Sequence, residues 1–380
     1  MGDLPTLKDH PGCNPECRAC HYKALDYPAQ LARKRQWAET QLAEWRDRLA
    51  PIVPAPESDR IGYREKSWFR SSFRDGKLSF GMFRARQGET RWEREFVSWD
   101  GCPIHVDAIR ETAERLAVAI AEREPRFAAD SLFGVWFGVP HVVLVANAPI
   151  PESIAALDWE KLLVAPIRHA WFHRTNQVGR TVFGVGPIDP LGGPVPEGLH
   201  PIRAFRQIAR TLLREARTEA VAALVAVKPD RVLDLYCGTG ELASLLPADL
   251  GWVGLEATRA AVEYARTLRR PSLAVPHLAF IGLVEDRLRD SALADAVGDS
   301  RYALYLNPPR PGLGPEGRAA MRDFVRARRP AGAVYLSCSA SSLARDLRMF
   351  VAEGASVESL RPFDFFPQTE HFETLAVLRF

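Results

Sequence analysis

The fold of the later half of the chain is decided by one stretch, Arg231-Val-Leu-Asp-Leu-Tyr-Cys-Gly-Thr-Gly-Glu-Leu242. Its first residues read as an apolar strand, and its glycines read as a tight turn that opens a helix. Glycine has no side chain, so such a turn lets the backbone approach a ligand closely. A second predicted strand ends at Glu256, where a carboxylate can hold ribose hydroxyls. The pattern therefore predicts a ribose-bearing ligand at the carboxyl edge of a sheet.

The later half alternates strands and helices regularly. A long helix is predicted over 205–227. Short apolar strands are predicted to follow it at 231–235, 252–256, 278–283, 302–306 and 333–338. This alternation predicts an α/β fold with a mostly parallel sheet that is covered on both faces. The glycine turn alone leaves open a nicotinamide cofactor or adenosylmethionine, because the dinucleotide pattern also accepts alanine at the position of Ala243.

Two further strand ends carry side chains that suit chemistry. The fourth strand runs into Asn307-Pro-Pro-Arg-Pro-Gly312, where two prolines fix a rigid loop and the Asn307 amide offers a donor and an acceptor. The fifth ends at Cys338, at the sheet edge where open α/β folds bind ligands. A buried structural cysteine is the alternative for Cys338, since free cysteine is among the most buried residue types. Cys237, inside the glycine turn, is interpreted as a small space-filling residue.

The length and composition of the chain set limits on its class. At 380 residues it is long enough for two or three domains, and 47% hydrophobic residues are ample for their cores. We find no run of about 18 apolar residues and no signal peptide at the start, so we expect a cytoplasmic protein without a membrane partner. The net charge of +3 neither requires nor excludes nucleic acid, because the clustering of cations decides that question.

The six cysteines are unevenly placed, which in a large chain favours metal binding or catalysis over disulfides. Cys13, Cys17 and Cys20 lie within eight positions, and thiols this close converge on one soft metal centre. Cys102 is the expected fourth ligand. Three histidines are weaker candidates for that place, His10, His21 and His105. Zinc and a [4Fe-4S] cluster both accept four thiolates, so the spacing leaves both open.

The region from 60 to 96 interleaves many cations with aromatic residues, and Asp75-Gly-Lys77 predicts a hairpin turn within it. Cations that grip a phosphate backbone and rings that stack on unpaired bases are what RNA binding requires. An ordinary antiparallel sheet, with aromatic residues inside and charges outside, is the alternative. Helices are predicted around this region over 28–49, 105–124 and 154–164, with one or two strands within 133–148.

Three segments follow from these signals. Residues 1–50 form a cysteine segment and a scaffold helix, and Cys102 completes the cysteine set. Residues 51–198 form a central α+β domain that contacts RNA. The Pro/Gly-rich run 187–196 then leads to a boundary near Leu199, and residues 199–380 form the α/β domain.

These motifs together resemble the RNA uracil-C5 methyltransferase family, whose members are class I adenosylmethionine enzymes. Six motifs carry the resemblance in order, Phe205-Arg-Gln207, Asp234-Leu-Tyr-Cys-Gly-Thr-Gly240, Gly254-Leu-Glu256, Asn307-Pro-Pro-Arg-Pro-Gly312, Leu336-Ser-Cys338 and Phe366-Pro-Gln-Thr-Glu-His-Phe-Glu373. The resemblance implies a Rossmann-like sheet, adenosylmethionine as cofactor and RNA as partner. It also implies a [4Fe-4S] cluster rather than zinc at the four cysteines. Three residues depart from the family pattern, Arg206, Ala209 and Ser339.

The resemblance also implies a role for each site residue. Cys338 would add to C6 of uracil, and Glu373 would remove the C5 proton, with Glu370 and His371 as nearby competitors. Seven residues would hold the cofactor or the base, Gln207, Asp234, Tyr236, Gly238, Gly240, Glu256 and Asn307. Glu285 or Asp286 would reach the adenine. An ordinary thiol is only a few per cent ionised at neutral pH, so we expect Cys338 to be activated locally.

Within the family, Asn307 and the lack of an additional β-barrel ahead of the cysteines most resemble the branch that methylates 23S ribosomal RNA. Transfer RNA is the alternative substrate. An inactive iron-sulfur RNA-binding protein is a further alternative, although both Cys338 and Glu373 are present. A DNA cytosine methyltransferase is disfavoured, because its nucleophile would directly follow a Pro-Pro pair and Arg310 stands there. We expect a monomer.

Overall fold

A computed structural model describes residues 6–85, 94–176, 183, 186–192, 199, 201–204, 210–268 and 277–380. The chain divides into two compact units, each made of two segments. Unit 1 comprises Met1–Asp26 and Glu57–Ile202, and unit 2 comprises Tyr27–Pro56 and Arg203–Phe380. Among the described residues, no helix is both long enough and apolar enough to cross a bilayer.

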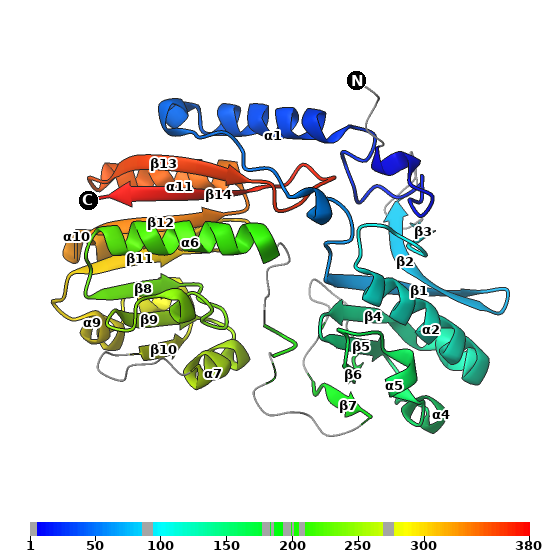
Figure 1. The fold of residues 1–380 in the computed structure, drawn as a ribbon. Coiled ribbons are helices and arrows are strands. Elements are labelled where there is room, and N and C mark those ends of the chain that lie inside the picture. Colours follow the sequence, from blue (N-terminus) through cyan, green and yellow to red (C-terminus); the bar gives the residue numbers. More distant parts are fainter. Residues whose placement is uncertain are drawn as a thin grey trace. The chain divides into compact units, whose positions relative to one another are not determined.

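Unit 2 is built on a seven-stranded sheet with the order β10-β9-β8-β11-β12-β14-β13 (Figure 1). Its strands are β8 Arg231–Leu235, β9 Gly251–Glu256, β10 His277–Ile281, β11 Tyr302–Leu306, β12 Gly332–Ser337, β13 Ser356–Phe363 and β14 Glu373–Arg379. The strands from β10 to β12 are parallel to one another, and β14 runs antiparallel to both of its neighbours. The predicted α/β fold with a mostly parallel sheet is confirmed.

Helices cover both faces of this sheet because its central strands are apolar on both sides. One face packs against α6 Arg210–Ala226 and α7 Arg259–Thr267. The other face packs against four helices, α8 Val284–Arg287, α9 Ser291–Val297, α10 Gly314–Ala327 and α11 Ala340–Ala352. Alternate residues of β8 serve the two layers, so Val232 belongs to the first core and Leu233 to the second.

Unit 1 contains a second mixed sheet with the order β3-β2-β1-β4-β5-β6-β7. Its strands are β1 Lys66–Arg74, β2 Lys77–Ala85, β3 Arg94–Ser98, β4 Leu132–Gly138, β5 His141–Ala146, β6 His169–Arg174 and β7 Asp189–Leu191. Asp75 and Gly76 both have positive φ, which gives the β1–β2 turn the twist that a tight hairpin needs. The hairpin predicted at Asp75-Gly-Lys77 is therefore present.

One face of this sheet forms a core with the helices α2 Asp107–Arg123, α3 Pro125–Asp130, α4 Glu152–Ala155 and α5 Trp159–Leu162. The helix predicted over 105–124 corresponds to α2. The single helix predicted over 154–164 is instead the pair α4 and α5. Asp158 separates them, because its carboxylate accepts a hydrogen bond from the backbone N–H of Lys161 and so starts the second helix.

The helix predicted over 28–49 differs from the expectation in two ways. It is divided into α1 Tyr27–Gln41 and a 3-10 segment, Ala43–Arg48, because Leu42 between them departs from helical geometry; Trp45 forms a further kink inside the 3-10 segment. It also belongs to unit 2, whereas we had grouped it with the cysteines of residues 1–50. The chain after it pairs with β13 through the bridges Leu49 to Leu360 and Val53 to Phe363. This segment therefore covers an edge of the sheet that would otherwise be exposed.

The core of unit 2 predicts a large effect for a single truncation on α11. Phe350 is fully buried, whereas the next residue, Val351, is 38% exposed. Phe350→Ala should lower the free energy of unfolding by about 3–5 kcal/mol, because it leaves a cavity that the sheet and helices cannot fill. Val351→Ala, the matched control, should change it by about 0.5 kcal/mol or less. Chemical denaturation measures both, and equal losses would contradict the packing described here.

Candidate active site

The register of β12 and β14 brings the two proposed reactive side chains together. Ser337 pairs with Thr374, the last pair of that antiparallel ladder. Cys338 is the next residue on one strand and Glu373 the next on the other, so they lie opposite each other at the edge of the sheet. Glu373 also pairs with Phe363 on its other side and is only 3% exposed. Two residues that are 35 positions apart in the sequence thus share one site.

The charges around Cys338 oppose one another. Burial and, to a smaller extent, the nearby Glu373 carboxylate raise the pKa of its thiol to about 11, although the Arg310 guanidinium opposes them through its charge and a hydrogen bond. Arg310 was part of a motif but had no role in our sequence interpretation. Arg310 offsets part of the rise, but the pKa of the thiol stays above its ordinary value, so the local activation that we expected is not seen. Arg310 is the second charged group beside the thiol, after Glu373.

The loop that carries Arg310 is fastened to α11 by buried polar contacts. The Asp346 carboxylate is fully buried and accepts hydrogen bonds from the backbone N–H of Leu313 at 2.9 Å and from the Tyr335 hydroxyl at 2.7 Å. The Ser342 hydroxyl donates to the Arg310 carbonyl at 2.9 Å. An isolated aspartate within a helix carries no pattern that predicts such a contact, so sequence reasoning missed Asp346.

The glycine turn after β8 has the geometry of a ligand cradle. Tyr236, Gly238 and Gly240 all have positive φ. The Glu256 carboxylate accepts hydrogen bonds from the backbone N–H groups of Gly238 at 3.2 Å and Thr258 at 2.8 Å, which ties the turn to the end of β9. A Cβ placed on Gly238 would meet no atom within 4 Å, so the space above that residue is open. A Cβ on Gly240 would lie 3.0 Å from Ala265, so Gly240 is needed for packing.

Asp234 and Cys237 lie below this turn rather than in its open space. Asp234 is buried in β8, and its carboxylate accepts a hydrogen bond from the Trp252 indole at 3.0 Å. Burial raises the pKa of Asp234 to about 7. Cys237 lies against Gly254, where a Cβ would come within 2.9 Å of its sulfur. These contacts give both residues a supporting position beneath the turn.

The remaining predicted cofactor residues lie at neighbouring strand ends. The backbone N–H of Asn307 donates to the carbonyl of Leu235 at 3.3 Å, so the end of β11 lies beside the end of β8. Tyr236 is half-buried near Glu285, Asp346 and Glu256, and burial followed by those charges raises the pKa of its hydroxyl. Asp286, by contrast, is exposed. Gln207 lies outside the described residues.

In unit 1 the four cysteines Cys13, Cys17, Cys20 and Cys102 line one small cavity. Burial raises the pKa of Cys20 to about 12, and the neighbouring cysteines add to that rise. Two backbone segments meet tightly here, since a Cβ on Gly12 would lie 2.0 Å from the carbonyl oxygen of Gly101. Two loops far apart in the sequence therefore bring four thiols to one place, and this donor set fits a metal ion or an iron-sulfur cluster.

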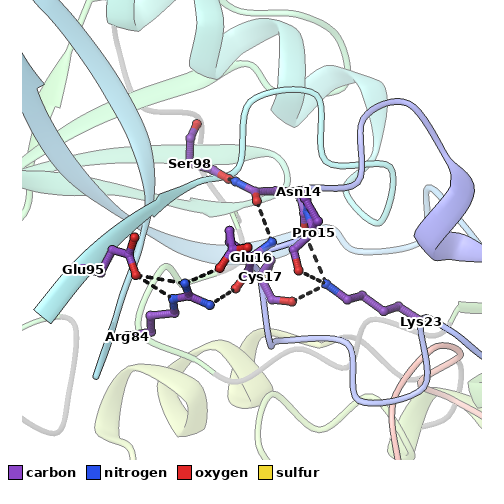
Figure 2. A network of polar contacts seen from close by, with 8 residues as sticks. All are labelled: Asn14, Pro15, Glu16, Cys17, Lys23, Arg84, Glu95 and Ser98. Carbon is purple, nitrogen blue, oxygen red and sulfur yellow. Dashed lines mark hydrogen bonds and ion pairs between the residues drawn. The ribbon is translucent and has the colours of Figure 1, made fainter. Parts of the chain in front are cut away.

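Figure 2 shows how the cysteine loop is held. The Lys23 ammonium donates to the carbonyls of Pro15 at 2.7 Å and Cys17 at 2.6 Å. The Arg84 guanidinium forms ion pairs with Glu16 on the loop and with Glu95 on β3 (Figure 2). Arg84 was one of the cations that we assigned to RNA binding, and the structure instead gives it this anchoring position.

The other predicted RNA-binding residues divide between the core and one face of the sheet. Phe69 and Phe80 are buried in the core of unit 1, as the alternative interpretation required. Lys66, Trp68 and Arg70 alternate with Phe69 along β1 and lie half-buried on the opposite face, where Trp68 packs against a small apolar cluster that includes Trp136. There the Arg70 guanidinium lies within 6.0 Å of the ring centres of Trp68, Phe83 and Phe133. We call Lys66, Trp68, Arg70, Phe83 and Phe133 the basic-aromatic surface. Arg86, Arg91 and Trp92 lie outside the described residues.

Comparisons with known proteins decide the family. No protein-family model matches the sequence. An uncharacterized RNA methyltransferase of Geobacter sulfurreducens is 34% identical over 398 residues, which cover 95% of this chain and 75% of that protein. A 23S rRNA (uracil(1939)-C(5))-methyltransferase of Marinomonas is 25% identical, covering 96% of this chain and 79% of that protein. The chain belongs to the RNA uracil-C5 methyltransferase family.

One solved structure has the same fold as this chain. It is the Pyrococcus abyssi tRNA (uracil-54, C5)-methyltransferase in complex with S-adenosyl-L-homocysteine. The TM-score is 0.67 at 21% identity, and the match covers 96% of this chain and 86% of that one. The class I, Rossmann-like fold predicted for the C-terminal sheet is thereby confirmed, and membership makes the chain an adenosylmethionine-dependent RNA methyltransferase.

The electrostatics of this methyltransferase site predict the pH dependence of Cys338. Because its pKa is raised to about 11 and only the thiolate reacts, alkylation by iodoacetamide should quicken about tenfold per pH unit between about pH 7 and 9. Glu373→Gln removes a negative charge, so the pKa should fall and alkylation at a given pH should speed up. Arg310→Met should slow it. Mass spectrometry of the Cys338 peptide measures the rates, and a slower Glu373→Gln variant would contradict this electrostatic balance.

Proposed function

We propose that this methyltransferase forms 5-methyluridine through a covalent bond between Cys338 and C6 of uracil, and that its substrate is 23S ribosomal RNA. The observation that carries the proposal is the position of Cys338 opposite Glu373 at the carboxyl edge of the sheet. A nucleophile and a base that both act on adjacent carbon atoms of one ring must lie this close.

The two side chains would act in sequence. C5 of uracil is a poor nucleophile, so the Cys338 thiolate first adds to C6, and the electron pair of the C5–C6 double bond moves toward C5 and the ring carbonyl. Adenosylmethionine, when bound, supplies the methyl group that C5 takes. Glu373 then accepts the C5 proton, the double bond re-forms, and the sulfur leaves C6 with its electron pair. The Arg310 guanidinium stabilises the sulfur while it is anionic.

The residues around the glycine turn would hold adenosylmethionine. Gly238 leaves open space for its methionine end, and the Glu256 carboxylate lies where a ribose is bound in sheets of this type. Tyr236, Asn307 and Gln207 complete the proposed set, with Asp234 supporting the turn. Glu285 is favoured over Asp286 for the adenine, because it lies close enough to Tyr236 to affect its pKa.

The basic-aromatic surface of unit 1 would contact the RNA. A uridine in folded RNA is stacked and must be unpaired or flipped out before its C5 and C6 atoms can be reached. The Arg70 guanidinium lies near the rings of three aromatic side chains there. Cations and rings in this combination bind phosphates and stack on bases.

The four cysteines would hold a [4Fe-4S] cluster. They supply four thiols to one cavity, and the hydrophobic side chains of Leu7, Trp99 and Ile104 line it with them. A cluster held there would fasten the loop of Cys13 to the segment of Cys102 by covalent bonds. This position within unit 1 suits a structural role in shaping the proposed RNA-binding domain.

Two observations concern the choice of RNA. Asn307 follows the pattern of the branch that methylates ribosomal RNA, and the Marinomonas relative is named as a 23S rRNA methyltransferase. Transfer RNA is the second candidate, because the solved structure with the same fold is a tRNA methyltransferase.

We also propose, as the sequence predicted, that the protein is monomeric and cytoplasmic.

The reaction is tested by incubating the protein with labelled adenosylmethionine and either unmodified 23S rRNA or tRNA, followed by mapping of the product. We expect 5-methyluridine in the rRNA. Cys338→Ala should lower the rate by at least about 10³-fold, since without the thiolate C5 is not activated. Ser341→Ala, an exposed change three residues later, should retain the activity. Undiminished methylation by Cys338→Ala would contradict the mechanism, and a product in tRNA alone would overturn the ribosomal assignment.

The cluster is tested by absorbance and metal content. Protein purified without oxygen should show a broad visible band and bound iron, and Cys17→Ala should lose both because a four-thiolate site cannot close with three. Cys237→Ala should keep both, because Cys237 lies in unit 2 beneath the glycine turn. A colourless protein that contains zinc would contradict the assignment.

A further inference from the structure

Helix α1, which we expected to be a scaffold helix, buries two long polar side chains. Gln30 is 1% exposed and Lys34 is 0% exposed, and they lie one helical turn apart on the same face as Tyr27. Neither amide nor ammonium belongs in an ordinary scaffold interface, because burying such groups costs free energy unless every hydrogen bond is made. Their partners therefore show what this face of the helix is for.

All three side chains contact the loop that links β13 to β14. The Lys34 ammonium forms an ion pair with Asp364 at 2.5 Å and donates to the carbonyl of Phe366 at 3.0 Å. The Gln30 amide exchanges two hydrogen bonds of 2.8 Å with Gln368, one with its side chain and one with its backbone N–H. The Tyr27 hydroxyl donates to Asp364 at 2.8 Å.

This loop leads directly into Glu373. Asp364 follows Phe363, the residue that pairs with Glu373 at the end of the β13–β14 ladder. Gln368 lies midway along the loop and has a φ of 69°, a conformation that a non-glycine residue adopts only when its surroundings hold it. The double contact from Gln30 supplies that hold. The position at which the chain enters β14 is thus fixed from α1.

A gain in stability does not by itself account for these contacts. Both members of the Lys34–Asp364 pair are fully buried, and their attraction has to offset the loss of two hydration shells. Apolar side chains of similar size would stabilise such an interface equally well or better. Hydrogen-bonded polar groups differ from apolar ones in that they accept only one relative placement of their partners.

We propose that Gln30 and Lys34 are positioning residues for the methyl-transfer site, which hold the 364–372 loop so that the Glu373 carboxylate meets the C5 proton. The inference rests on the proposed function. It assigns the contacts to one step, the release of the protein from the methylated base, because Glu373 acts only after sulfur addition and methyl transfer. Loss of the contacts should leave those earlier steps less affected than the release.

Such a block has a distinctive product. If the C5 proton is not removed, the C5–C6 double bond does not re-form, and the sulfur stays bonded to C6 of a base that already carries the new methyl group. A covalent protein–RNA complex then accumulates with ordinary uridine. General loss of folded protein would instead lower complex formation and turnover together.

The experiment compares four variants of the full chain on RNA that the wild-type protein methylates. Gln30→Leu and Lys34→Met each remove one set of contacts. Lys34→Met/Asp364→Leu replaces the ion pair by apolar groups, so no unpaired buried charge is left, and it removes the hydrogen bonds of Lys34 and Tyr27 to the loop while those of Gln30 remain. Arg35→Met removes an exposed ion pair with Glu39 from the same helix and is the matched control. Denaturing gels measure the covalent complex, and single-turnover assays measure its release.

We expect Gln30→Leu, Lys34→Met and the double variant to release RNA about 10- to 100-fold more slowly and to accumulate the complex, since a misplacement of about 1 Å can cost that much. Arg35→Met should behave as the wild type. Glu373→Gln serves as the reference for a complete block. If Glu373→Gln accumulates the complex and the α1 variants do not, the positioning role is overturned while the proposed function stands. If wild type makes no 5-methyluridine, or if Glu373→Gln accumulates no complex, the proposed function fails first.

Discussion

The site depends on the antiparallel insertion of β14 between β12 and β13. The five neighbouring strands β10, β9, β8, β11 and β12 all run in one direction, so their carboxyl ends present side chains to one edge of the sheet. Only a strand that runs the other way brings its first residue to that same edge. Because β14 is such a strand, Glu373 begins it opposite the end of β12, where Cys338 stands. A sheet with β14 reversed would place the carboxylate at the far end of the ladder.

This arrangement carries an electrostatic conflict that the proposed reaction can use. A carboxylate beside a thiol disfavours the thiolate, and burial acts in the same direction, while Arg310 opposes both. The resting site therefore keeps the sulfur protonated. The same carboxylate is needed later, when the C5 proton must leave, so the nucleophile and the base cannot be separated. A cation on a rigid Pro-Pro loop, fastened by the buried Asp346, is the compensation that the structure provides.

The sequence predicted the features that depend on local pattern. The apolar strands, the glycine turn and the β1–β2 hairpin were correctly placed, because each is specified by residues a few positions apart. The four cysteines were grouped correctly by donor chemistry, although their approach to one cavity depends on two distant loops. The family followed from motifs that were recognised by resemblance, whereas the order of the strands in the sheet was not predicted.

Features that depend on distant partners were missed. The sequence predicted the helix that contains α1 but gave Gln30 and Lys34 no role, since their partners lie more than 300 positions away. For the same reason the helix was grouped with the wrong part of the chain. In the sequence Arg84 does not differ from the other cations of its strand, whereas in the structure it forms ion pairs with Glu16 and Glu95. A single sequence shows which residues are charged but not which charges are already paired.

The central claim is that the sulfur of Cys338 bonds to C6 of the target uridine and that the neighbouring Glu373 carboxylate later removes the C5 proton. The most direct test uses RNA in which fluorine replaces the hydrogen at C5, so that the proton which Glu373 should remove is absent. After nuclease and protease digestion, tandem mass spectrometry should find a methylated, fluorinated uridine attached to Cys338. Attachment to a different residue, or methylation without any attachment, would contradict the account.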